Sequence, residues 1–518
     1  MKLTILATSD LHGYIEPTNF GSRGQNQPFG AAKAAAVIEA TRNHADGPTV
    51  VIENGDFIQG SPLSYYIAKQ QAGSPELLTN VANAIGYDAG ILGNHEFNYG
   101  RDYLEQATAA YHYPILCANI IDANGSPAFG KAYTILEKAG LKIAILGLTT
   151  SYIPNWEHPS HIEGLQFLDV ATTAKKYIPK LRELADIVIV SYHGGFERDL
   201  ISGEPTEALT KENQGYQLLE EVPGIDALIT GHQHRVIADT INGVPIIQPG
   251  FRGEYVGQIV LELAADNGNY SITSATPSLL ATKDAIPDKT VSEQIAPIAA
   301  EVENWLDAPL GTVSGDMRIT DPDKARLFEH PYVEFIQKVQ MEASSAAISG
   351  TALFNNEGTG FSHTITMRDV VTNYIYPNTL AVLKVTGADL RAALERSASF
   401  FQMEADGSIG INPTFISPKP QYYNYDMYEG INYTIHVQQP IGERVSPILY
   451  KGKQVQPDDV LEIVINQYRA VGGGDYPMFD ASKIIREIQI DMTELIADYL
   501  KRHPIVKATV NNNFQVRI

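Results

Sequence analysis

Residues 3–13 read LTILATSDLHG, a short and largely apolar run that ends in two polar side chains, Asp10 and His12. Runs of this kind, rich in β-branched residues, are typical of strands that are covered on both faces. The pattern recurs along the first half of the chain, in TVVIE (49–53), AGILG (89–93), PILCA (114–118), KIAILGL (142–148), DIVIVSY (186–192) and DALITG (226–231).

Segments with helical character separate these runs of apolar residues. They include GAAKAAAVIEATRNH (30–44), PELLTNVANAIG (75–86) and VATTAKKYIPKLRELA (170–185). Strands that alternate with helices predict an α/β layered domain in which the strands are largely parallel. We expect this domain to occupy residues 1–265.

The composition of the chain changes after about residue 265. A polar stretch, ATPSLLATKDAIPDKTVSEQ (275–294), leads into a helical segment that ends near residue 310, so residues 266–310 are predicted to be a linker and connecting helix. The remainder, 311–518, mixes helices such as YVEFIQKVQMEASS with strands such as VLEIVIN. We expect it to form a second, α+β domain with its own core, because 518 residues exceed the usual size of one core.

Five segments place metal-binding side chains directly after apolar runs: TSDLHGYIEP (8–17), NGDFIQGSP (54–62), GNHEFNYG (93–100), SYHGGFE (191–197) and GHQH (231–234). Together they offer Asp10, His12, Asp56, Asn94, His193, His232 and His234. Open α/β sheets bind their ligands at the carboxyl ends of strands. Oxygen and imidazole donors gathered there are the ligands expected of a hydrolase with two metal ions.

Taken singly, the motifs are weak. Asp10 and His12 could be a capping Asp and an incidental His, although alternate residues of an extended backbone would point them to one side. The same alternation would pair His232 with His234. Asp56 could simply open a turn, but its two oxygens also suit a carboxylate that bridges two cations about 3.5–4 Å apart.

The conjunction of the motifs favours the metal interpretation, since five of the thirteen histidines lie in these five segments. His95 follows Asn94 and should point away from the metal, which leaves it free to contact a substrate. The single cysteine, Cys117, excludes a disulfide within the chain and a thiolate-rich metal site, and we expect it to be buried.

The formal charge of −22 argues against general affinity for a nucleic-acid polymer, because such binding depends on basic surface. No run approaches the roughly 18 apolar residues of a membrane span. The first residues, MKLTILATSD, lack the parts of a signal peptide. We therefore expect a cytoplasmic protein without a membrane partner, as a monomer or weak dimer, although a trimmed export signal would leave the same sequence.

The ordered motifs DLHG, GDFIQG, GNHEFNYG, YHGG and GHQH resemble those of the calcineurin-like metallophosphoesterases. The second half resembles the C-terminal domain of the 5′-nucleotidases in FNNEGTGF (354–361), YPNTLAVLKVTGADLRAALE (376–395), YNYDMYEGINYTIHVQQPIGERV (423–445) and NQYRAVGGGDYP (466–477). The resemblance implies a four-layer α/β/β/α domain, a connecting helix and a substrate-binding domain. GNHEFNYG and NQYRA are most similar to the 2′,3′-cyclic-nucleotide 2′-phosphodiesterase/3′-nucleotidase branch.

The resemblance also implies roles for individual residues. Asp10, His12, Asp56 and His234 would hold one divalent ion, Mn²⁺ or Zn²⁺, and Asp56, Asn94, His193 and His232 would hold the other. His95 would stabilise the transferring phosphoryl group or protonate the leaving oxygen. Tyr376 and Tyr468 would sandwich the base of a nucleotide, and Asn378 would hydrogen-bond to it.

Two departures from the 5′-nucleotidase pattern bear on the substrate. Asn98 stands where many 5′-nucleotidases have an Asp that supports the catalytic His, and the cyclic-nucleotide branch has the same Asn. The segment NNEGTGF contains no phosphate-binding arginine. Both departures favour hydrolysis of 2′,3′-cyclic nucleotides and 3′-nucleotides to nucleoside and phosphate.

Three alternatives stay open. The chain could be a 5′-nucleotidase or nucleotide-sugar hydrolase, or a sulfur-oxidation hydrolase of the same superfamily. It could also be a non-catalytic nucleotide-binding protein, which would fail to bind two metals per chain.

Overall fold

The computed structural model describes residues 1–518 except 71–73, 156, 208, 267–268, 377, 418 and 489. Two compact units make up the chain: unit 1, Met1–Val302, and unit 2, Glu303–Ile518. Each unit has its own sheets, and each is described separately below.

The first sheet of unit 1 has the strand order β14-β13-β1-β2-β3-β4. Strands β1 to β4 run parallel to one another, whereas β13 is antiparallel to β1 and β14 is antiparallel to β13. The apolar sequences of β1 and β2 are buried along nearly their whole length, as strands covered on both faces require. The bounds are β1 Lys2–Thr8, β2 Thr49–Glu53, β3 Ala89–Ile91, β4 Ile115–Leu116, β13 Tyr255–Asp266 and β14 Asn269–Ala281.

The second sheet of unit 1 has the order β11-β12-β10-β9-β7-β6. Its central strands β7, β9, β10 and β12 are parallel, and the edge strands β6 and β11 are antiparallel to their neighbours. The bounds are β6 Tyr133–Lys138, β7 Leu141–Thr149, β9 Ile187–His193, β10 Ala227–Ile229, β11 Val236–Ile241 and β12 Val244–Pro249. A short ribbon, β5 Ile120–Ile121 with β8 Gln166–Phe167, lies outside both sheets.

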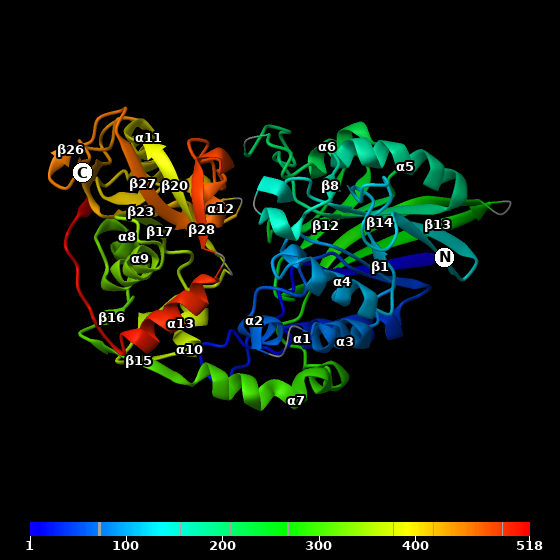
Figure 1. Ribbon diagram of the computed structural model, residues 1–518. Helices are drawn as coiled ribbons and strands as arrows, with labels where there is room; N and C mark the ends of the chain where they lie inside the picture. The colour runs from blue at the N-terminus through cyan, green and yellow to red at the C-terminus, as the bar shows by residue number, and fades with distance from the viewer. Residues whose placement is uncertain are drawn as a thin grey trace. The chain divides into compact units, whose positions relative to one another are not determined.

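The two sheets share a core in which Ile5 and Ile52 of the first sheet pack with Ile145 and Ile189 of the second. A second core lies between the outer face of the second sheet and helices α5 and α6. Helices α1, α3 and α4 lie on the opposite side of the sheets (Figure 1). The predicted four-layer α/β/β/α architecture is therefore confirmed. The bounds are α1 Ala31–His44, α2 Pro62–Gln70, α3 Glu76–Ile85, α4 Arg101–Ala110, α5 Val170–Leu184 and α6 Gly215–Glu221.

Part of the predicted linker has regular structure. Residues 269–281 form β14, which pairs with β13 at the edge of the first sheet. Because an edge strand is covered incompletely, its Ser- and Thr-rich sequence, NYSITSATPSLLA, has the polarity of a linker. Helix α7, Lys289–Leu306, follows and runs across the boundary between the two units.

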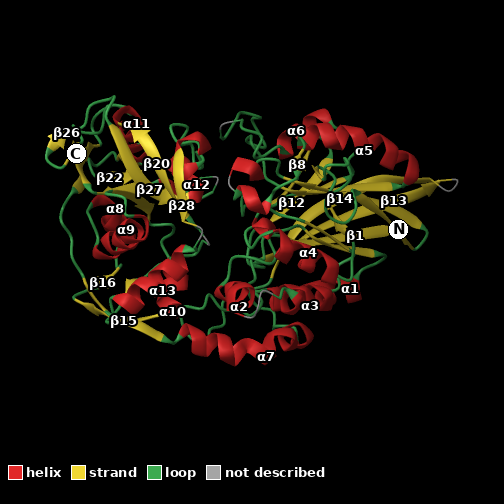
Figure 2. Cartoon of the chain, viewed as in Figure 1, coloured by secondary structure: helices red, strands yellow, loops and turns green. Residues whose placement is uncertain are grey.

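Unit 2 is built around a mixed sheet with the order β23-β17-β27-β20-β28. Figure 2 shows this sheet with its helices, and α9 and α11 both pack against it. The α+β class predicted for this half is confirmed. The bounds are β17 Ile348–Ala352, β20 Leu380–Thr386, β23 Asp426–Glu429, β27 Val460–Asn466, β28 Ile484–Ile488, α9 Pro331–Ser344, α11 Gly387–Ala398 and α12 Gln467–Ala470.

Smaller sheets complete unit 2, with the orders β19-β15-β29, β26-β25-β24-β30, β16-β18 and β21-β22. Their strands are β15 Pro309–Ser314, β16 Met317–Arg318, β18 Gly360–Phe361, β19 Thr364–Thr366, β21 Phe401–Met403, β22 Ile409–Ile411, β24 Ile431–His436, β25 Leu449–Tyr450, β26 Lys453–Gln454, β29 Ile505–Lys507 and β30 Phe514–Arg517. The remaining helices are α8 Pro322–Leu327, α10 Met367–Asn373 and α13 Met492–Arg502.

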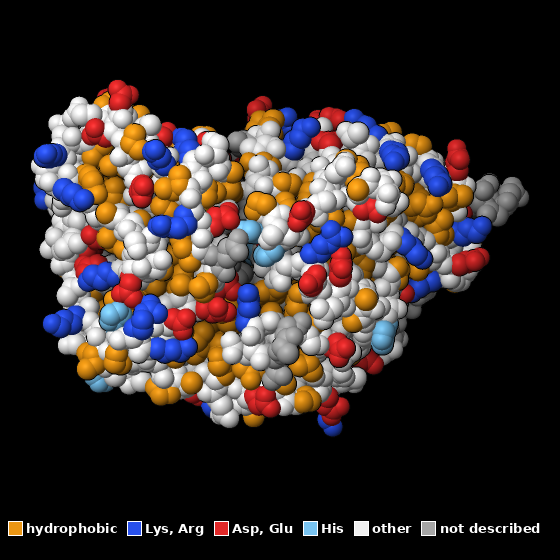
Figure 3. Space-filling model, viewed as in Figure 1, with side chains coloured by type: hydrophobic (Ala, Val, Ile, Leu, Met, Phe, Trp, Pro, Cys, Tyr) orange, Lys and Arg blue, Asp and Glu red, His pale blue; other side chains and the backbone are white. Residues whose placement is uncertain are grey.

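Two surface properties bear on partners. Acidic and basic side chains are interspersed over the face shown in Figure 3. Within the described residues, no helix is both long enough and apolar enough to cross a membrane.

Candidate metal centre

The five sequence motifs follow five strands of unit 1. Strands β1, β2 and β3 are parallel neighbours in the first sheet, and β9 and β10 are parallel neighbours in the second. Their carboxyl ends are followed or formed by Asp10 and His12 (β1), Asp56 (β2), Asn94 (β3), His193 (β9), and His232 and His234 (β10). The predicted position of these residues at strand ends is confirmed, and their role as metal ligands stays a prediction.

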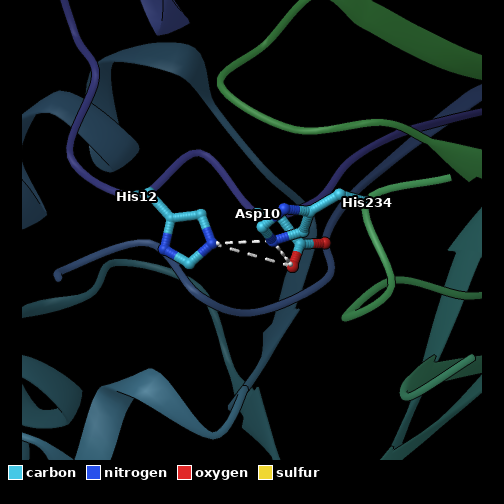
Figure 4. Close-up of side chains that lie close together, drawn as sticks. All are labelled: Asp10, His12 and His234. Carbon is cyan, nitrogen blue, oxygen red and sulfur yellow. Dashed lines mark hydrogen bonds and ion pairs between the residues drawn. The ribbon is translucent and has the colours of Figure 1, made fainter. Parts of the chain in front are cut away.

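The first cluster consists of Asp10, His12 and His234, whose candidate ligand atoms all lie within 4.8 Å of one another. Figure 4 shows the two rings and the carboxylate pointing toward one another. Nε2 of His234 lies 3.1 Å from Nε2 of His12 and 3.4 Å from Oδ1 of Asp10. Three donor atoms therefore converge as the ligands of one cation would.

The second cluster consists of Asp56, His193 and His232, whose candidate ligand atoms meet the same 4.8 Å criterion. Asn94 joins it, because its Oδ1 lies 2.8 Å from Nδ1 of His232. All four residues are buried. The residues of both predicted ligand sets thus lie together, and each set includes residues from segments more than 100 residues apart in the sequence.

Asp56 lies between the two clusters. Its Oδ2 atom is 3.1 Å from Nε2 of His193 and 3.9 Å from Nε2 of His12. One carboxylate oxygen is therefore close to imidazoles of both clusters, which is the position that a bridging ligand requires.

The tautomers of His12 and His193 leave one ring nitrogen of each available to bind a cation. Nδ1 of His12 lies 2.9 Å from the carbonyl oxygen of Gln59, and Nδ1 of His193 lies 2.7 Å from that of Asn54. A carbonyl only accepts, so each Nδ1 donates and each Nε2 is left to bind a metal, the usual arrangement in metalloproteins. Nε2 of His193 is buried and lies 3.1 Å from Oδ2 of Asp56. A ring nitrogen that faces a carboxylate in this way lies where the predicted metal ligand is expected.

Two ionised carboxyls and one protonated imidazole dominate the electrostatics of the clusters. Burial disfavours charge on both carboxyls, but the surrounding imidazoles together outweigh it and hold the pKa of each carboxyl well below the usual range: His193 and His234 act on Asp10, and His193, His95 and His12 act on Asp56. Burial also opposes charge on His193, yet Asp56 and Asp10 raise its pKa to about 10. Burial lowers the pKa of His12 to about 3, so this ring is neutral. A bound cation would displace the His193 proton, since imidazole must be deprotonated to ligate.

The ligand backbones differ from the prediction. The sequence predicts extended segments in which alternate side chains share a side, whereas Asp10 (φ 56°), His12 (φ 50°), His232 (φ 67°) and His234 (φ 56°) are all left-handed. Asp56 has the same conformation (φ 58°). That prediction is wrong because the strands end before the ligands begin, and the chain turns sharply there. Such backbone strain is typical of functional sites, where the surrounding packing maintains it.

Two glycines of the GDFIQG motif are needed for space. A Cβ on Gly55 would lie 2.7 Å from Nδ1 of His193, and a Cβ on Gly60 would lie 2.6 Å from Cβ of His12. Both glycines also have positive φ. The absence of a side chain at both positions therefore lets the backbone approach the candidate ligands closely.

Glu96, in the 3₁₀ turn η1 (His95–Phe97), holds the two loops of the first sheet together. Its buried carboxylate accepts hydrogen bonds from the backbone N–H groups of Asp56 (2.8 Å), Phe57 (2.6 Å) and Gly93 (2.6 Å). These bonds join the loop after β2 to the loop after β3. Glu96 is within the GNHE motif, but the sequence carried no sign that it binds a loop 40 residues earlier.

Two further residues orient ligands and were missed by the sequence reasoning. Oε1 of Glu212 lies 3.0 Å from Nε2 of His232, the nitrogen that faces away from Asn94. The Phe251 ring stacks on His234 with a centroid distance of 4.8 Å and an interplanar angle of 2°. Neither residue is in a ligand motif, and both lie outside the helices and strands of the structure.

His95 lies beside both clusters. Its backbone N–H donates to Oδ1 of Asp56 (2.8 Å), and its ring centroid is 5.2 Å from that of His12. Its Nδ1 lies 2.7 Å from Oδ1 of Asn98, whose Nδ2 donates to Oε2 of Glu157 at 2.7 Å. Asn98 therefore contacts the His95 ring as predicted, and Glu157 is an additional partner.

In unit 2, the predicted base-binding residues lie at one end of two paired strands. Leu380 at the start of β20 pairs with Asn466 at the end of β27, and the N–H of Gln467 donates to the carbonyl of Thr379. The segments that carry Tyr376, Asn378 and Tyr468 are therefore neighbours. The Tyr376 ring packs edge-on against Phe354 (5.5 Å), and the Tyr468 ring against Tyr423 (6.3 Å). The sandwiching of a base by the two tyrosines stays a prediction.

An arginine does lie behind the loop that contains NNEGTGF. Arg326 of α8 donates to Oδ1 of Asn356 (2.7 Å) and to the carbonyl of Leu353 (3.1 Å), and it stacks over the ring of Tyr422. Its side chain is only 1% exposed. The guanidinium is therefore occupied in holding the loop.

Comparison with known proteins agrees with this architecture. Residues 3–236 match the family described as calcineurin-like phosphoesterase, and residues 309–481 match the 5′-nucleotidase C-terminal domain. The chain is 31% identical to the 2′,3′-cyclic-nucleotide 2′-phosphodiesterase/3′-nucleotidase of Salmonella typhimurium, over 91% of this chain and 82% of that protein.

Two other similar proteins are covered by this chain to very different extents. The chain is 27% identical to a trifunctional nucleotide phosphoesterase of Bacillus subtilis, but it spans only 39% of that protein. A crystal structure from Staphylococcus aureus, named as a candidate 5′-nucleotidase, is 40% identical, with a TM-score of 0.93 and full coverage of both chains. With both halves matched in order, the chain belongs to the 5′-nucleotidase family of calcineurin-like metallophosphoesterases.

Proposed function

We propose that this protein hydrolyses phosphate esters of nucleotides at a centre of two divalent metal ions. The observation that carries the proposal is the position of Asp56, whose Oδ2 is within 4 Å of imidazole nitrogens from both ligand clusters. Asp10, His12, Asp56 and His234 hold one ion in this proposal. Asp56, Asn94, His193 and His232 hold the other.

Mn²⁺ and Zn²⁺ are the metals that we propose for the centre. The donors are carboxylates, imidazoles and one amide oxygen, a mixture that suits either ion. Cys117 does not compete as a ligand, because it is fully buried and burial raises the pKa of its thiol to about 12. When bound, two such ions supply the Lewis acidity that activates a water molecule and neutralises charge on the phosphoryl oxygens.

His95 is the proposed catalytic residue. Its backbone is held by Asp56 and its ring by Asn98, which places an imidazole beside the metal clusters without using it as a ligand. Nδ1 contacts Asn98, so Nε2 is the nitrogen left for the substrate. In this role His95 stabilises the transferring phosphoryl group or donates a proton to the leaving oxygen.

Unit 2 would recognise the nucleoside in this account. Stacking between Tyr376 and Tyr468 accepts any base, because every base has a π-face, and Asn378 adds a hydrogen bond. The two tyrosines lie on adjacent segments, which supports a shared binding site.

Cyclic 2′,3′-nucleotides and 3′-nucleotides are the proposed substrates. Support comes from the name of the Salmonella relative, from the amide at position 98, and from the loop 354–361. That loop has no arginine of its own, and the Arg326 guanidinium behind it is buried and hydrogen-bonded. A competing assignment, 5′-nucleotidase, is favoured by the name of the similar Staphylococcus structure.

A substrate panel tests the proposal. Metal-stripped protein reloaded with Mn²⁺ or Zn²⁺ is assayed on 2′,3′-cyclic AMP, 3′-AMP and 5′-AMP, with release of inorganic phosphate as the readout. We expect kcat/KM to be higher for the first two substrates. Faster turnover of 5′-AMP would establish the 5′-nucleotidase alternative, and absence of metal-dependent turnover on all three would refute the proposal.

A further inference from the structure

A chain of hydrogen bonds leads from His95 away from the metal centre. Nδ1 of His95 is 2.7 Å from Oδ1 of Asn98, and Nδ2 of Asn98 donates to Oε2 of Glu157 at 2.7 Å. The Glu157 side chain is only 7% exposed. Glu157 lies 59 residues after Asn98, between the 3₁₀ turns η2 (Ile153–Asn155) and η3 (Pro159–His161).

Glu157 fixes the end of this hydrogen-bond chain that lies farther from His95. Its other oxygen, Oε1, accepts from the backbone N–H of His158 (2.8 Å) and lies 2.7 Å from Nδ1 of His161. A carboxylate offers acceptors only, so Asn98 must present its NH₂ group to Glu157 and its carbonyl oxygen to His95. A hydrogen must then lie on Nδ1 of His95. An amide by itself would set no such direction, because either end can face the ring.

We propose that Glu157 is a positioning residue that acts through Asn98 to fix the tautomer of His95. The fixed hydrogen on Nδ1 leaves Nε2 as the nitrogen that meets the phosphoryl group or the leaving oxygen. This inference rests on the proposed function, in which His95 acts on the substrate.

These hydrogen bonds bear on the Asn at position 98, where many 5′-nucleotidases have an Asp. Where an Asp follows the catalytic His, one side chain both accepts from Nδ1 and carries the charge. Here Asn98 is the acceptor, and Glu157 supplies the carboxylate one hydrogen bond further out. The two segments also pack closely, since a Cβ on Gly100 would lie 3.5 Å from the His161 ring.

Glu157→Gln is expected to reverse the direction of the hydrogen bonds between His95, Asn98 and residue 157. The N–H of His158 would hold the oxygen of the introduced amide, because a backbone N–H only donates. The new NH₂ group then faces Asn98, which must turn its carbonyl outward and its own NH₂ toward His95. We expect the His95 hydrogen to move to Nε2, and kcat for a nucleotide to fall about 10- to 100-fold with little change in KM.

A second substitution, at position 98, should restore the original direction of these hydrogen bonds. Asn98→Asp alone places a carboxylate against Glu157 and is expected to lower kcat at least as much as Glu157→Gln does. In the double variant Asn98→Asp with Glu157→Gln, the new carboxylate accepts from both the introduced amide and Nδ1 of His95. We expect the double variant to return to within about threefold of wild-type kcat, the mark of strongly coupled sites.

Two readouts separate positioning from general damage. The ¹⁵N shifts of the His95 ring, assigned by their loss in His95→Gln, report the tautomer without any turnover, while thermal midpoints and metal content report folding. Glu163→Gln, an exposed change of the same kind nearby, is the control and should match the wild type.

The possible outcomes are distinct. Nε2–H in Glu157→Gln, with Nδ1–H and kcat both restored in the double variant, supports the proposal. Unchanged ring shifts in Glu157→Gln, or a double variant no better than the single ones, would overturn it. If the wild type hydrolyses no nucleotide, the proposed function fails, and the ring shifts alone then decide whether Glu157 sets the tautomer.

Discussion

The Oδ2 atom of Asp56 lies 3.1 Å from Nε2 of His193, and both side chains are buried. The same oxygen is 3.9 Å from Nε2 of His12, which belongs to the other ligand cluster. Asp56 follows a strand of the first sheet and His193 ends a strand of the second. The contact between them therefore joins the two sheets at the candidate metal centre.

Asp56→Asn should abolish turnover. An amide has one oxygen and no charge, so it cannot bridge two cations as a carboxylate does. We expect kcat to fall below detection with Mn²⁺ or Zn²⁺ added in excess, while the circular dichroism spectrum stays that of the wild type. The exposed Asp284→Asn is a matched control. Near-wild-type turnover in the metal-loaded Asp56 variant would contradict the assignment.

Glu212 should control the affinity of the second metal position. Its carboxylate holds Nε2 of His232 at 3.0 Å and so directs Nδ1 toward Asn94. Loss of such a partner typically weakens metal binding about 10- to 100-fold. We expect this loss in Glu212→Ala and a smaller one in Glu212→Gln, which keeps an acceptor. Calorimetric titration with the metal measures the affinity of each of the two equivalents. In the variants we expect one equivalent to be held tightly and the other to be weakened. Equal affinities in the wild type and both variants would exclude this role of Glu212.

The tyrosine pair should matter only for substrates with a base. Stacking contributes about 1–3 kcal/mol per base, so Tyr376→Ala with Tyr468→Ala should raise KM for 3′-AMP by at least about tenfold. For p-nitrophenyl phosphate, which has no base, KM should change little. Equal effects on both substrates would argue that the tyrosines only support the fold.

Unit 2 should depend on a buried ion pair. Nε of Arg469 donates to Oδ2 of Asp426 at 2.7 Å, and the two side chains are 1% and 2% exposed. Asp426→Asn leaves a buried cation without its counter-charge and should lower the free energy of unfolding by about 3–5 kcal/mol. Asp475→Asn removes the partner of Arg396 at a 64% exposed position and should cost less than about 1 kcal/mol.

Calorimetry of the full chain compares these two Asp→Asn variants. The transition of unit 2 should shift in Asp426→Asn and stay in place in Asp475→Asn. Equal shifts of the unfolding transition in the two variants would mean that burial of the ion pair does not determine its contribution to stability.

The sequence predicts the locations of the candidate ligands well, because a strand end is visible as the end of an apolar run. It predicts their backbone conformation badly. Asp10 and His234 are left-handed because packing at the junction of two sheets forces the turn, and no local pattern of side chains reports that crowding. In the sequence, the glycines of GDFIQG indicate this crowding, since a side chain at either position would collide with a candidate ligand.

The partners of His232 and of Asn98 that lie outside the motifs were harder to find for a related reason. Glu157 and Glu212 lie in irregular segments, and each reaches a partner from another part of the chain. Strand β14 was misjudged because an edge strand needs few apolar residues. Periodicity reports burial along one element, whereas these features depend on which elements meet.

The most direct test of the central claim is anomalous diffraction from crystals of the protein loaded with Mn²⁺ or Zn²⁺. Two peaks per chain are expected about 3.5–4 Å apart, with Asp56 between them and one peak beside each ligand cluster. A single peak, or two peaks that Asp56 does not join, would contradict it.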